Sequence, residues 1–472
     1  MQKTVEDYSS GGTFMSQAKE NPLWSGRWAL MAVIILYALV HLPFVGFGFG
    51  EPDAWRNGLV ALSLAQGLGW GPNSRVPGFP VVELSFGLLA KWVSPETLWI
   101  YTNLLTLLIS LMGMYIYFKI ALYHRISHPL IPVLLLYFIP VVFINAAFSM
   151  DNLWAMTFLL MTYWFLLQAK PFWASLFFAL AIGSRLTSAI FLFPFLVCLV
   201  WNRLVFPKKE SLSGAVWLLT ATFVLGIIYV GLNWNTFGYL KENIFISRDY
   251  IRSGYYFLQQ IFGLPGTLIL IGMIIWRWGK FPSWNWELSF LIMVVILYAI
   301  LFLYRPEKPS YFIPVLPFLV LWICRWLKEY GSYLLTGLII LNNIVAFVVV
   351  HPTPEGLTLQ AVGKGIAWDS YHRYQYYKRD ADFIIHYPYP PDTKVETGFR
   401  HPGVLFLLEL PAYQHRKQEL LTNRIVFPEV LDKEKRRNTY WVSGALSYKI
   451  ERQFLASKKY QILYLPSARS GP

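Results

Sequence analysis

Long apolar runs are the feature that most restricts what this chain can fold into. Stretches of roughly 18 or more apolar residues recur along its first 350 positions, a length typical of membrane-spanning helices. They fall near residues 28–48, 97–118, 130–147, 152–168, 171–184, 186–202, 213–232, 257–276, 287–304, 310–326 and 332–350. Only 14% of the chain is charged. The pattern predicts an all-α polytopic membrane protein with about eleven transmembrane helices.

A shorter run, Val81–Val93, carries Glu83 and Lys91 and is near the lower length limit for a crossing. We expect it to lie at the membrane interface or to re-enter the membrane without crossing it. The orientation of the chain supports this assignment. With Met1 in the cytoplasm, the loops on the cytoplasmic side are rich in lysine and arginine, as the positive-inside rule requires. Counting Val81–Val93 as a crossing would reverse that bias.

The distribution of the apolar runs divides the chain into three parts, of which the first two contain residues 1–350. Residues 1–27 form a polar cytoplasmic segment, and residues 28–350 form the transmembrane domain, with a first outer loop over residues 47–96. The first apolar run is too long for a signal-peptide core and lacks a small-residue cleavage site, so we interpret it as an uncleaved anchor. The chain is therefore expected in the inner (plasma) membrane.

Composition changes at His351, where charges, prolines and tyrosines become frequent. Residues 351–472 are predicted to form a small α/β extracytoplasmic domain, long enough for a core of its own. Four short segments resemble strands, and Val404–Leu410 is compatible with a strand or a buried helix. The four segments are Ala381–His386, Lys394–Thr397, Asn438–Val442 and Tyr460–Leu465.

The formal net charge of +14 does not indicate a nucleic-acid-binding protein, because the basic residues are scattered among short loops. Both cysteines, Cys198 and Cys324, lie inside apolar runs, which excludes a disulfide framework. The eight histidines form no metal-binding motif.

An acidic pair, Glu51-Pro52-Asp53, follows the first apolar run directly. Alternating glycines up to Gly50 allow a sharp turn just before it, and the next residues read as an amphipathic helix. Acidic residues at the mouth of a membrane helix are costly unless they face water or a site. The pair is either a solvated loop or the base of a transfer reaction. As carboxylates, the two acids would also be the ligands of a divalent cation, Mg²⁺ or Mn²⁺, if the protein uses one.

Three more polar positions fall on the same predicted outer face. Arg75 lies in the stiff loop Asn73–Pro80 and is either a phosphate ligand or a surface-turn residue contacting lipid headgroups. Asp151 begins a helix after Phe148-Ser149-Met150 and is either a helix cap or a site residue. Arg185 interrupts two apolar segments and either snorkels to headgroups or faces a cavity.

A further segment, Tyr304–Pro317, places Arg305 and Lys308 beside Tyr311 at the outer end of a helix pair. Cations beside aromatic rings suit a lipid-linked phosphate. The alternative is a plain aromatic belt at the membrane interface.

The order and spacing of these motifs resemble the GT-C superfamily of integral-membrane glycosyltransferases over roughly residues 28–350. Its members include polyprenyl-phosphate-sugar mannosyltransferases and the aminoarabinose transferases of lipid A. The resemblance implies an outward active site, a lipid-phosphate sugar donor, an inverting displacement and a soluble C-terminal roof. By position, Glu51 or Asp53 matches the catalytic acid pair, and Asp151 matches a second acidic site. Arg185 and Arg305 match cations near the donor phosphate.

The expected function is therefore transfer of a sugar from a polyprenyl-phosphate carrier to a hydroxyl of a glycan, lipid or protein, with a carboxylate as general base. The acidic pair reads Glu-Pro-Asp where related branches have Asp-Glu or Asp-x-Asp, so either acid is a candidate base, with Asp53 preferred. A lipid-linked-sugar transporter or flippase is the main alternative, but the apolar runs carry few mid-membrane charges and no evident repeat. A lipid-linked glycan polymerase or ligase is the third reading.

Overall fold

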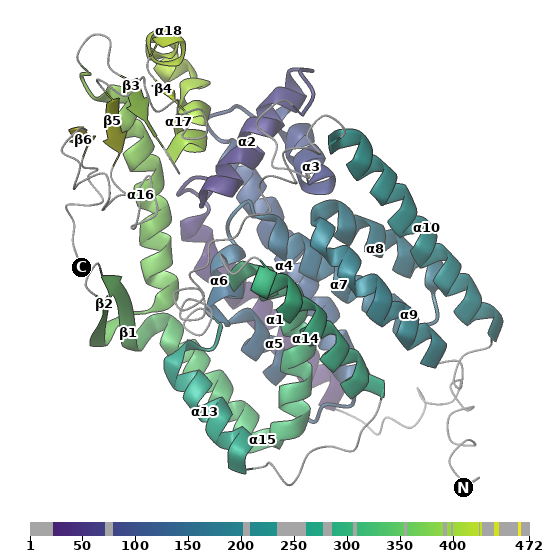
Figure 1. The fold of residues 1–472 in the computed structure, drawn as a ribbon. Helices are drawn as coiled ribbons and strands as arrows, with labels where there is room; N and C mark the ends of the chain where they lie inside the picture. The colour runs from purple at the N-terminus through teal and green to yellow at the C-terminus, as the bar shows by residue number, and fades with distance from the viewer. Residues whose placement is uncertain are drawn as a thin grey trace, which may run out of the picture.

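The structure is a computed structural model that describes residues 22–70, 79–201, 208–233, 261–276, 286–304, 309–353, 356–389, 394–397, 400–423, 425–426, 439–442 and 461–463. Over these residues the fold is mostly helical, with the strands confined to the part after Ile344 (Figure 1). The described α-helices are α1 (Pro22–His41), α2 (Pro52–Ala65), α3 (Pro80–Ala90), α4 (Leu98–Tyr123), α5 (Leu130–Tyr137), α6 (Pro140–Asn145), α7 (Asp151–Leu167), α8 (Pro171–Ser184), α9 (Leu192–Trp201), α10 (Lys208–Asn233), α13 (Gly263–Trp276), α14 (Trp286–Tyr304), α15 (Leu316–Ile344), α16 (Ile366–His386), α17 (His401–Leu408) and α18 (Gln414–Asn423). Short 3₁₀ segments are η2 (Leu42–Phe44), η3 (Leu186–Phe191), η7 (Pro309–Val315) and η9 (Pro411–Tyr413).

The outside of the helical part is apolar, as expected for a membrane protein. Ile35 and Leu39 of α1 are 53% and 57% exposed, and Trp276 at the end of α13 is 79% exposed. Among the described residues, three segments are long and apolar enough to span a membrane: Gly26–Phe44, Leu98–Tyr123 and Ser310–Leu327. Exposed large apolar side chains of this kind are costly in water and favourable against lipid.

Helix α3 corresponds to the short run that was expected not to cross the membrane. Its 11 residues give a length of roughly 16 Å, about half of the hydrocarbon core of a bilayer. One face is buried through Val82, Glu83 and Phe86, and the other exposes Leu84 and Leu88. A straight helix of this length does not span a bilayer.

Two predicted helix boundaries were wrong for identifiable reasons. The run over residues 130–147 is divided into α5 and α6, and Pro140 is the first residue of α6, where it cannot continue the preceding helix. The last apolar run was expected to remain helical to Val350, but β1 (Val345–Thr353) begins five residues before that position. That segment reads Val-Ala-Phe-Val-Val-Val, and β-branched and aromatic residues favour a strand.

Helix α15 bends sharply between its two apolar parts. The hydroxyl of Ser332 donates a hydrogen bond to the carbonyl of Cys324, eight residues earlier, at 3.3 Å. In a straight α-helix these positions would be separated by about 12 Å along the axis. The bend therefore divides α15 near the boundary expected between the runs 310–326 and 332–350.

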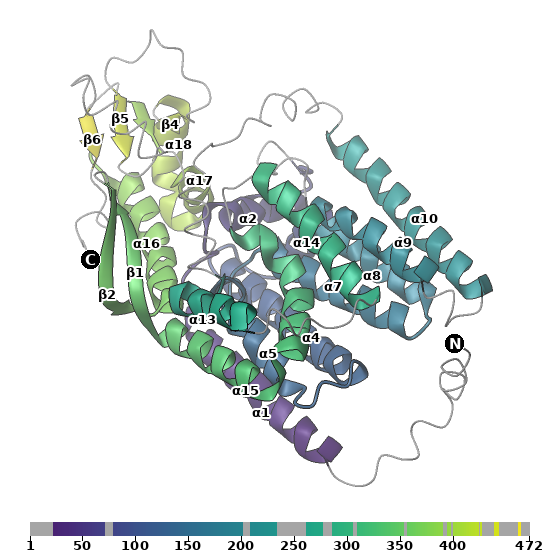
Figure 2. The same cartoon turned by 60° about the horizontal axis from the view of Figure 1, so that its bottom comes forward.

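The C-terminal part contains two sheets. Strand β1 pairs antiparallel with β2 (Gly356–Lys364), with Val345 opposite Lys364 and Thr353 opposite Gly356. A second sheet has the order β4-β3-β5-β6 and is parallel throughout; its strands are β4 (Ile425–Val426), β3 (Lys394–Glu396), β5 (Thr439–Val442) and β6 (Gln461–Leu463). Figure 2 shows the β1–β2 hairpin beside α16 and the parallel sheet near α17 and α18.

Three of the four expected C-terminal strands are confirmed, at β3, β5 and β6. The fourth, Ala381–His386, is wrong because this segment is the last part of α16. Its buried positions Tyr377, Ala381 and Ile384 recur at the spacing of one helix face rather than at the alternation of a strand. Val404–Leu410 is mainly helical, within α17.

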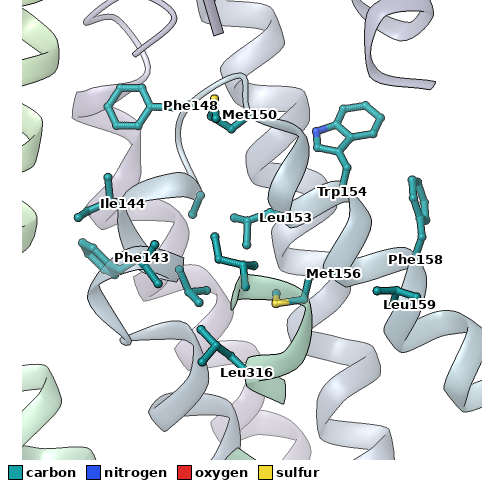
Figure 3. Packing of buried hydrophobic residues seen from close by; sticks show 14 of the residues in the cluster. Phe143, Ile144, Phe148, Met150, Leu153, Trp154, Met156, Phe158, Leu159 and Leu316 are labelled. Carbon is teal, nitrogen blue, oxygen red and sulfur yellow. The ribbon is translucent and has the colours of Figure 1, made fainter. Parts of the chain in front are cut away.

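Helix α7 lies at the centre of the core. Nearly all of its residues are buried, and it packs between α4, α8 and η7. Figure 3 shows Phe148, Met150, Leu153 and Trp154 around its first turns. A helix that is apolar on all sides is buried on all sides, and dense packing holds it rigidly. The packing therefore fixes the position of the polar residues at the start of α7.

Candidate active site

The turn that carries the acidic pair is shaped by glycines. Gly48 and Gly50 have φ of +103° and +104°, a backbone conformation that L side chains rarely adopt. A Cβ atom on Gly50 would come within 2.8 Å of the Phe148 ring. The side-chain amide of Asn103, in α4, donates to the carbonyls of Val45 and Gly48 at 2.9 and 2.8 Å. The turn is thus held in one conformation by its neighbours.

Both predicted acids stand at the start of α2. Glu51 is the N-cap residue in an extended conformation, and its side chain does not cap the helix. Pro52 occupies the first turn, where a missing N–H costs nothing. Asp53 follows in the same turn, and both carboxylates are half-buried. The positive end of the helix dipole stabilises a carboxylate at this position.

Ser149 connects the acidic turn to the start of α7. Its hydroxyl lies 2.7 Å from both Thr102 Oγ1 and Asn103 Oδ1. Its carbonyl accepts a hydrogen bond of 3.0 Å from the side-chain amide of Asn57, one helical turn after Asp53. Because each of these groups is buried, the network fixes the acidic turn relative to residues 149–151.

The start of α7 and the end of α8 meet in a buried ion pair. Arg185 Nη1 lies 2.6 Å from Asp151 Oδ2, and the two side chains are 8% and 0% exposed. The same nitrogen donates to Asn152 Oδ1 at 2.5 Å, and Nε donates to Thr187 Oγ1 at 3.2 Å. The guanidinium also lies 4.6 Å from the centre of the Tyr311 ring, a cation–π contact.

Two buried hydrogen-bond donors, one in Asn152 and one three residues after Arg185, have no hydrogen-bond partner among the described residues. Asn152 Nδ2 and Ser188 Oγ belong to side chains that are 0% exposed, and within the described part of the chain neither atom bonds to protein. A buried polar group without a partner costs about 1–3 kcal/mol, so such a group calls for an explanation. A polar ligand bound beside Arg185 supplies one. We call Asp151, Asn152, Arg185, Ser188 and Tyr311 the cationic centre.

Glu83 is a buried acid near this centre that the sequence analysis did not select. It is 0% exposed in the first turn of α3, where Oε2 accepts the N–H of Phe79 at 3.3 Å. Tyr229 of α10 interacts electrostatically with Glu83, Asp151 and Arg185, which places all of them in one neighbourhood. The signal that could have identified Glu83 is an acid inside an otherwise apolar run.

The structure shows where several of the residues selected from the sequence lie. Asp151 is the first residue of α7, and its carboxylate pairs with Arg185. Arg185 faces the protein interior and does not extend to headgroups. Tyr311 joins the same centre. Arg75, Arg305 and Lys308 lie outside the described residues.

Helices α16 and α17 of the C-terminal part cover the start of α2, and their residues were not selected from the sequence. Arg400, at the N-cap of α17, bonds to the buried Asp380 at 2.9 Å and lies over the Tyr377 ring. Beside it, His401 Nδ1 lies 2.9 Å from Thr397 Oγ1. Burial, with a smaller contribution from the Arg56 charge, lowers the pKa of His401 to about 4.

Residues 76–321 match glycosyltransferase family 87, a match that includes the whole cationic centre and more than half of the chain. The chain belongs to glycosyltransferase family 87. Its expected place among GT-C-type membrane glycosyltransferases is thereby confirmed. The acidic turn and α16–α17 lie outside the matched residues.

The structure is also similar to the crystal structure of ArnT from Cupriavidus metallidurans bound to undecaprenyl phosphate. The TM-score is 0.47 and the sequence identity 14%, over 92% of this chain and 89% of that chain. No curated protein matches the chain significantly.

Proposed function

We propose that this family 87 glycosyltransferase moves a sugar from a polyprenyl-phosphate carrier to a hydroxyl of a glycan, lipid or protein acceptor. The observation that carries the proposal is the cationic centre. The buried Arg185 bonds to Asn152, whose Nδ2 lacks a partner among the described residues, and Ser188, three residues after Arg185, carries a second such donor. A buried arginine accompanied by such unsatisfied donors suits the oxygens of a phosphate.

The leaving group of such a donor is a lipid phosphate, whose negative charge grows as the glycosidic bond breaks. Arg185 stabilises that charge, and Asp151 and Thr187 hold its guanidinium in place before the reaction. Preorganised donors of this kind contribute strongly to catalysis, since no reorganisation is needed during the reaction. We assign Arg75, Arg305, Lys308 and Tyr311 to the same donor-phosphate role, which the sequence motifs suggested.

Asp53 is our choice for the general base. As the acceptor hydroxyl attacks the anomeric carbon, its proton passes to the Asp53 carboxylate and the carrier phosphate leaves from the opposite side, which inverts the configuration. Glu51 orients the acceptor, and it is the alternative base. Position supports this assignment: the acids stand half-buried on a rigid turn that Ser149 and Asn57 tie to the start of α7.

A lipid-linked donor also accounts for a site among membrane helices. We place the reaction at the outer face, with Met1 in the cytoplasm and residues 351–472 outside, on the strength of the basic-loop asymmetry. The protein then works in the inner (plasma) membrane, where the carrier reaches the site from the bilayer.

Among the described residues, no group of three or more histidine, cysteine or acidic side chains is placed to hold an ion. Glu51 and Asp53 alone would supply two carboxylates to a Mg²⁺ or Mn²⁺ ion, and Mg²⁺ is commonly held by one or two carboxylates together with waters and substrate phosphate.

The test is turnover of a radiolabelled polyprenyl-phosphate sugar by purified variants. Asp53→Asn keeps the shape of the side chain and removes the base, so we expect turnover to fall by about a hundred- to ten-thousandfold while donor binding persists. Glu51→Gln should mainly raise the acceptor KM. If Asp53→Asn keeps most of its activity and Asp151→Asn is inactive, the base has been misassigned. Full activity in both variants would contradict the proposed function.

A further inference from the structure

Trp55 joins the acidic turn to three other parts of the protein, α4, α16 and α17. It follows Asp53 by two residues in α2 and is 0% exposed. Its indole N–H donates to the carbonyl of Gly50, the residue before Glu51, at 3.2 Å. The position of the indole ring therefore sets the position of the backbone on both sides of the acidic pair.

Aromatic rings enclose that indole. Phe49 lies 5.2 Å away edge-on, and Trp99 of α4 lies 6.4 Å away. The other two rings come from the C-terminal part: Tyr377 of α16 stacks at 5.7 Å and 23°, and Phe406 of α17 packs edge-on at 5.5 Å. We call these five residues the aromatic clamp.

Tyr377 is itself held tightly. A Cβ atom on Gly403 would come within 2.6 Å of the Tyr377 ring, so α17 lies directly against it. The charges of Asp53 and Arg56 both act on the Tyr377 hydroxyl, which places that side chain next to the first turns of α2. Figure 2 shows α16 and α17 adjacent to α2, although more than 300 residues separate them in sequence.

We propose that Tyr377 and Phe406 are positioning residues that act through Trp55 to hold the Asp53 carboxylate in its reactive place. The C-terminal part is then a component of the active site. This inference rests on the function proposed above, in which Asp53 is the base. A shift of about 1 Å in a catalytic group lowers the rate roughly a hundredfold, so a loosened clamp should reduce kcat.

The first measurement is the split between kcat and donor KM. Phe406→Leu and Tyr377→Leu remove one ring each, and we expect kcat to fall by roughly ten- to a hundredfold with donor KM changed less than about twofold. The cationic centre that binds the donor phosphate lies on other helices, which is why donor KM should hold. Tyr377→Phe keeps the stacked ring and loses only the hydrogen bond between the hydroxyl and the Gly403 backbone, so its kcat should fall much less than that of Tyr377→Leu.

A matched control is Phe383→Leu. Phe383 lies on the same helix as Tyr377 but packs against Tyr387 at 5.8 Å rather than against Trp55. The Phe383→Leu variant loses a six-membered ring from α16, as Tyr377→Leu does. If the substitutions act by damaging the C-terminal part in general, the kcat of Phe383→Leu should fall as well. We expect its kcat to stay near the wild-type value.

The second measurement does not depend on activity. In a chain with Cys198 and Cys324 replaced by alanine, Asp53→Cys provides one thiol, and its rate of alkylation by a maleimide reports how firmly position 53 is held. Phe406→Leu and Tyr377→Leu should raise that rate several-fold, whereas Tyr377→Phe and Phe383→Leu should not. Only protein that elutes as a single folded species is compared, and Phe406→Met replaces Phe406→Leu if the latter does not fold.

The outcomes separate the two proposals. Unchanged alkylation rates in the Leu variants would overturn the clamp, as would an equal rise in Phe383→Leu. Faster alkylation with an unchanged kcat would uphold the clamp and contradict the role of Asp53 as base.

Discussion

The buried ion pair between Asp151 and Arg185 yields a prediction in which stability and function move apart. Arg185→Leu removes the cation and leaves the Asp151 carboxylate at 0% exposure without its charge partner. Removing one member of a buried pair costs about 3–5 kcal/mol. We expect Arg185→Leu and Asp151→Leu each to lower the free energy of unfolding by about that amount.

The double variant Asp151→Leu/Arg185→Leu should be far more stable than either single variant. It removes both charges together, and replacing a buried ion pair with apolar residues is often neutral or stabilising. Two costs remain, because Asn152 Oδ1 and Thr187 Oγ1 lose the hydrogen bonds they accept from Arg185, at about 1 kcal/mol each. With a loss of about 3–5 kcal/mol in each single variant and about 2 kcal/mol in the double variant, the coupling energy from the four proteins should be about 4–8 kcal/mol in favour of the pair.

Donor binding should not recover with stability. Without Arg185 the phosphate loses a charge-assisted contact worth about 1.5–3 kcal/mol, or roughly ten- to a hundredfold in affinity. The assays are unfolding in mixed micelles and equilibrium binding of the polyprenyl-phosphate donor. Wild-type donor affinity in the double variant would show that Arg185 does not bind phosphate. If a single variant is as stable as the double variant, the remaining unpaired charge is not destabilising, and the reasoning about the buried pair is wrong.

Two further predictions concern substitutions that add or remove a single heavy atom. Ser188→Ala removes a buried hydroxyl that has no hydrogen-bond partner within the described structure. Donor affinity should fall several-fold while the free energy of unfolding stays the same or rises by up to about 1 kcal/mol. A loss of stability without a loss of affinity would refute this reading. Gly50→Ala forces an L side chain into a φ of +104° with its Cβ 2.8 Å from Phe148; it should destabilise by at least about 1 kcal/mol and lower kcat more than Gly46→Ala, whose Cβ meets nothing within 4 Å.

The meeting of Asp151 and Arg185 could have been predicted from the sequence, although the pairing itself was not. Two successive apolar helices joined by a short connection run antiparallel, so the first residue of α7 and the end of α8 lie at the same side. Both residues were placed on one face by the topology. Their bond at 2.6 Å is the consequence of that arrangement and of the high cost of an unpaired charge there.

The cover provided by α16 and α17 could not have been predicted in the same way. Tyr377 and Phe406 contact Trp55 across more than 300 positions, and no periodic pattern reports a contact of that range. The local pattern around Ala381 was also ambiguous, because a short apolar segment fits a strand or a helix equally well until its length is known. An acid inside a short apolar run marks Glu83 as unusual, but its burial depends on which face of α3 packs against the core, and the sequence does not give that contact.

His401 makes contact between α17 and α2 sensitive to pH. Burial and the neighbouring Arg56 lower its pKa from 6.5 to about 4, since a second positive charge is unfavourable beside the guanidinium. The unfolded chain then binds more protons than the folded one between these two values, so stability is complete above about pH 6.5 and falls as the pH drops toward 4. We expect the thermal midpoint of the purified protein to drop between pH 7 and pH 5, and His401→Gln, which keeps a polar side chain without a titrating ring, to reduce that drop. Because the two proteins differ only at position 401, the difference between their pH profiles reports the titration of His401 and not that of carboxylates. Equal pH dependence in both proteins would show that His401 is not held neutral against Arg56.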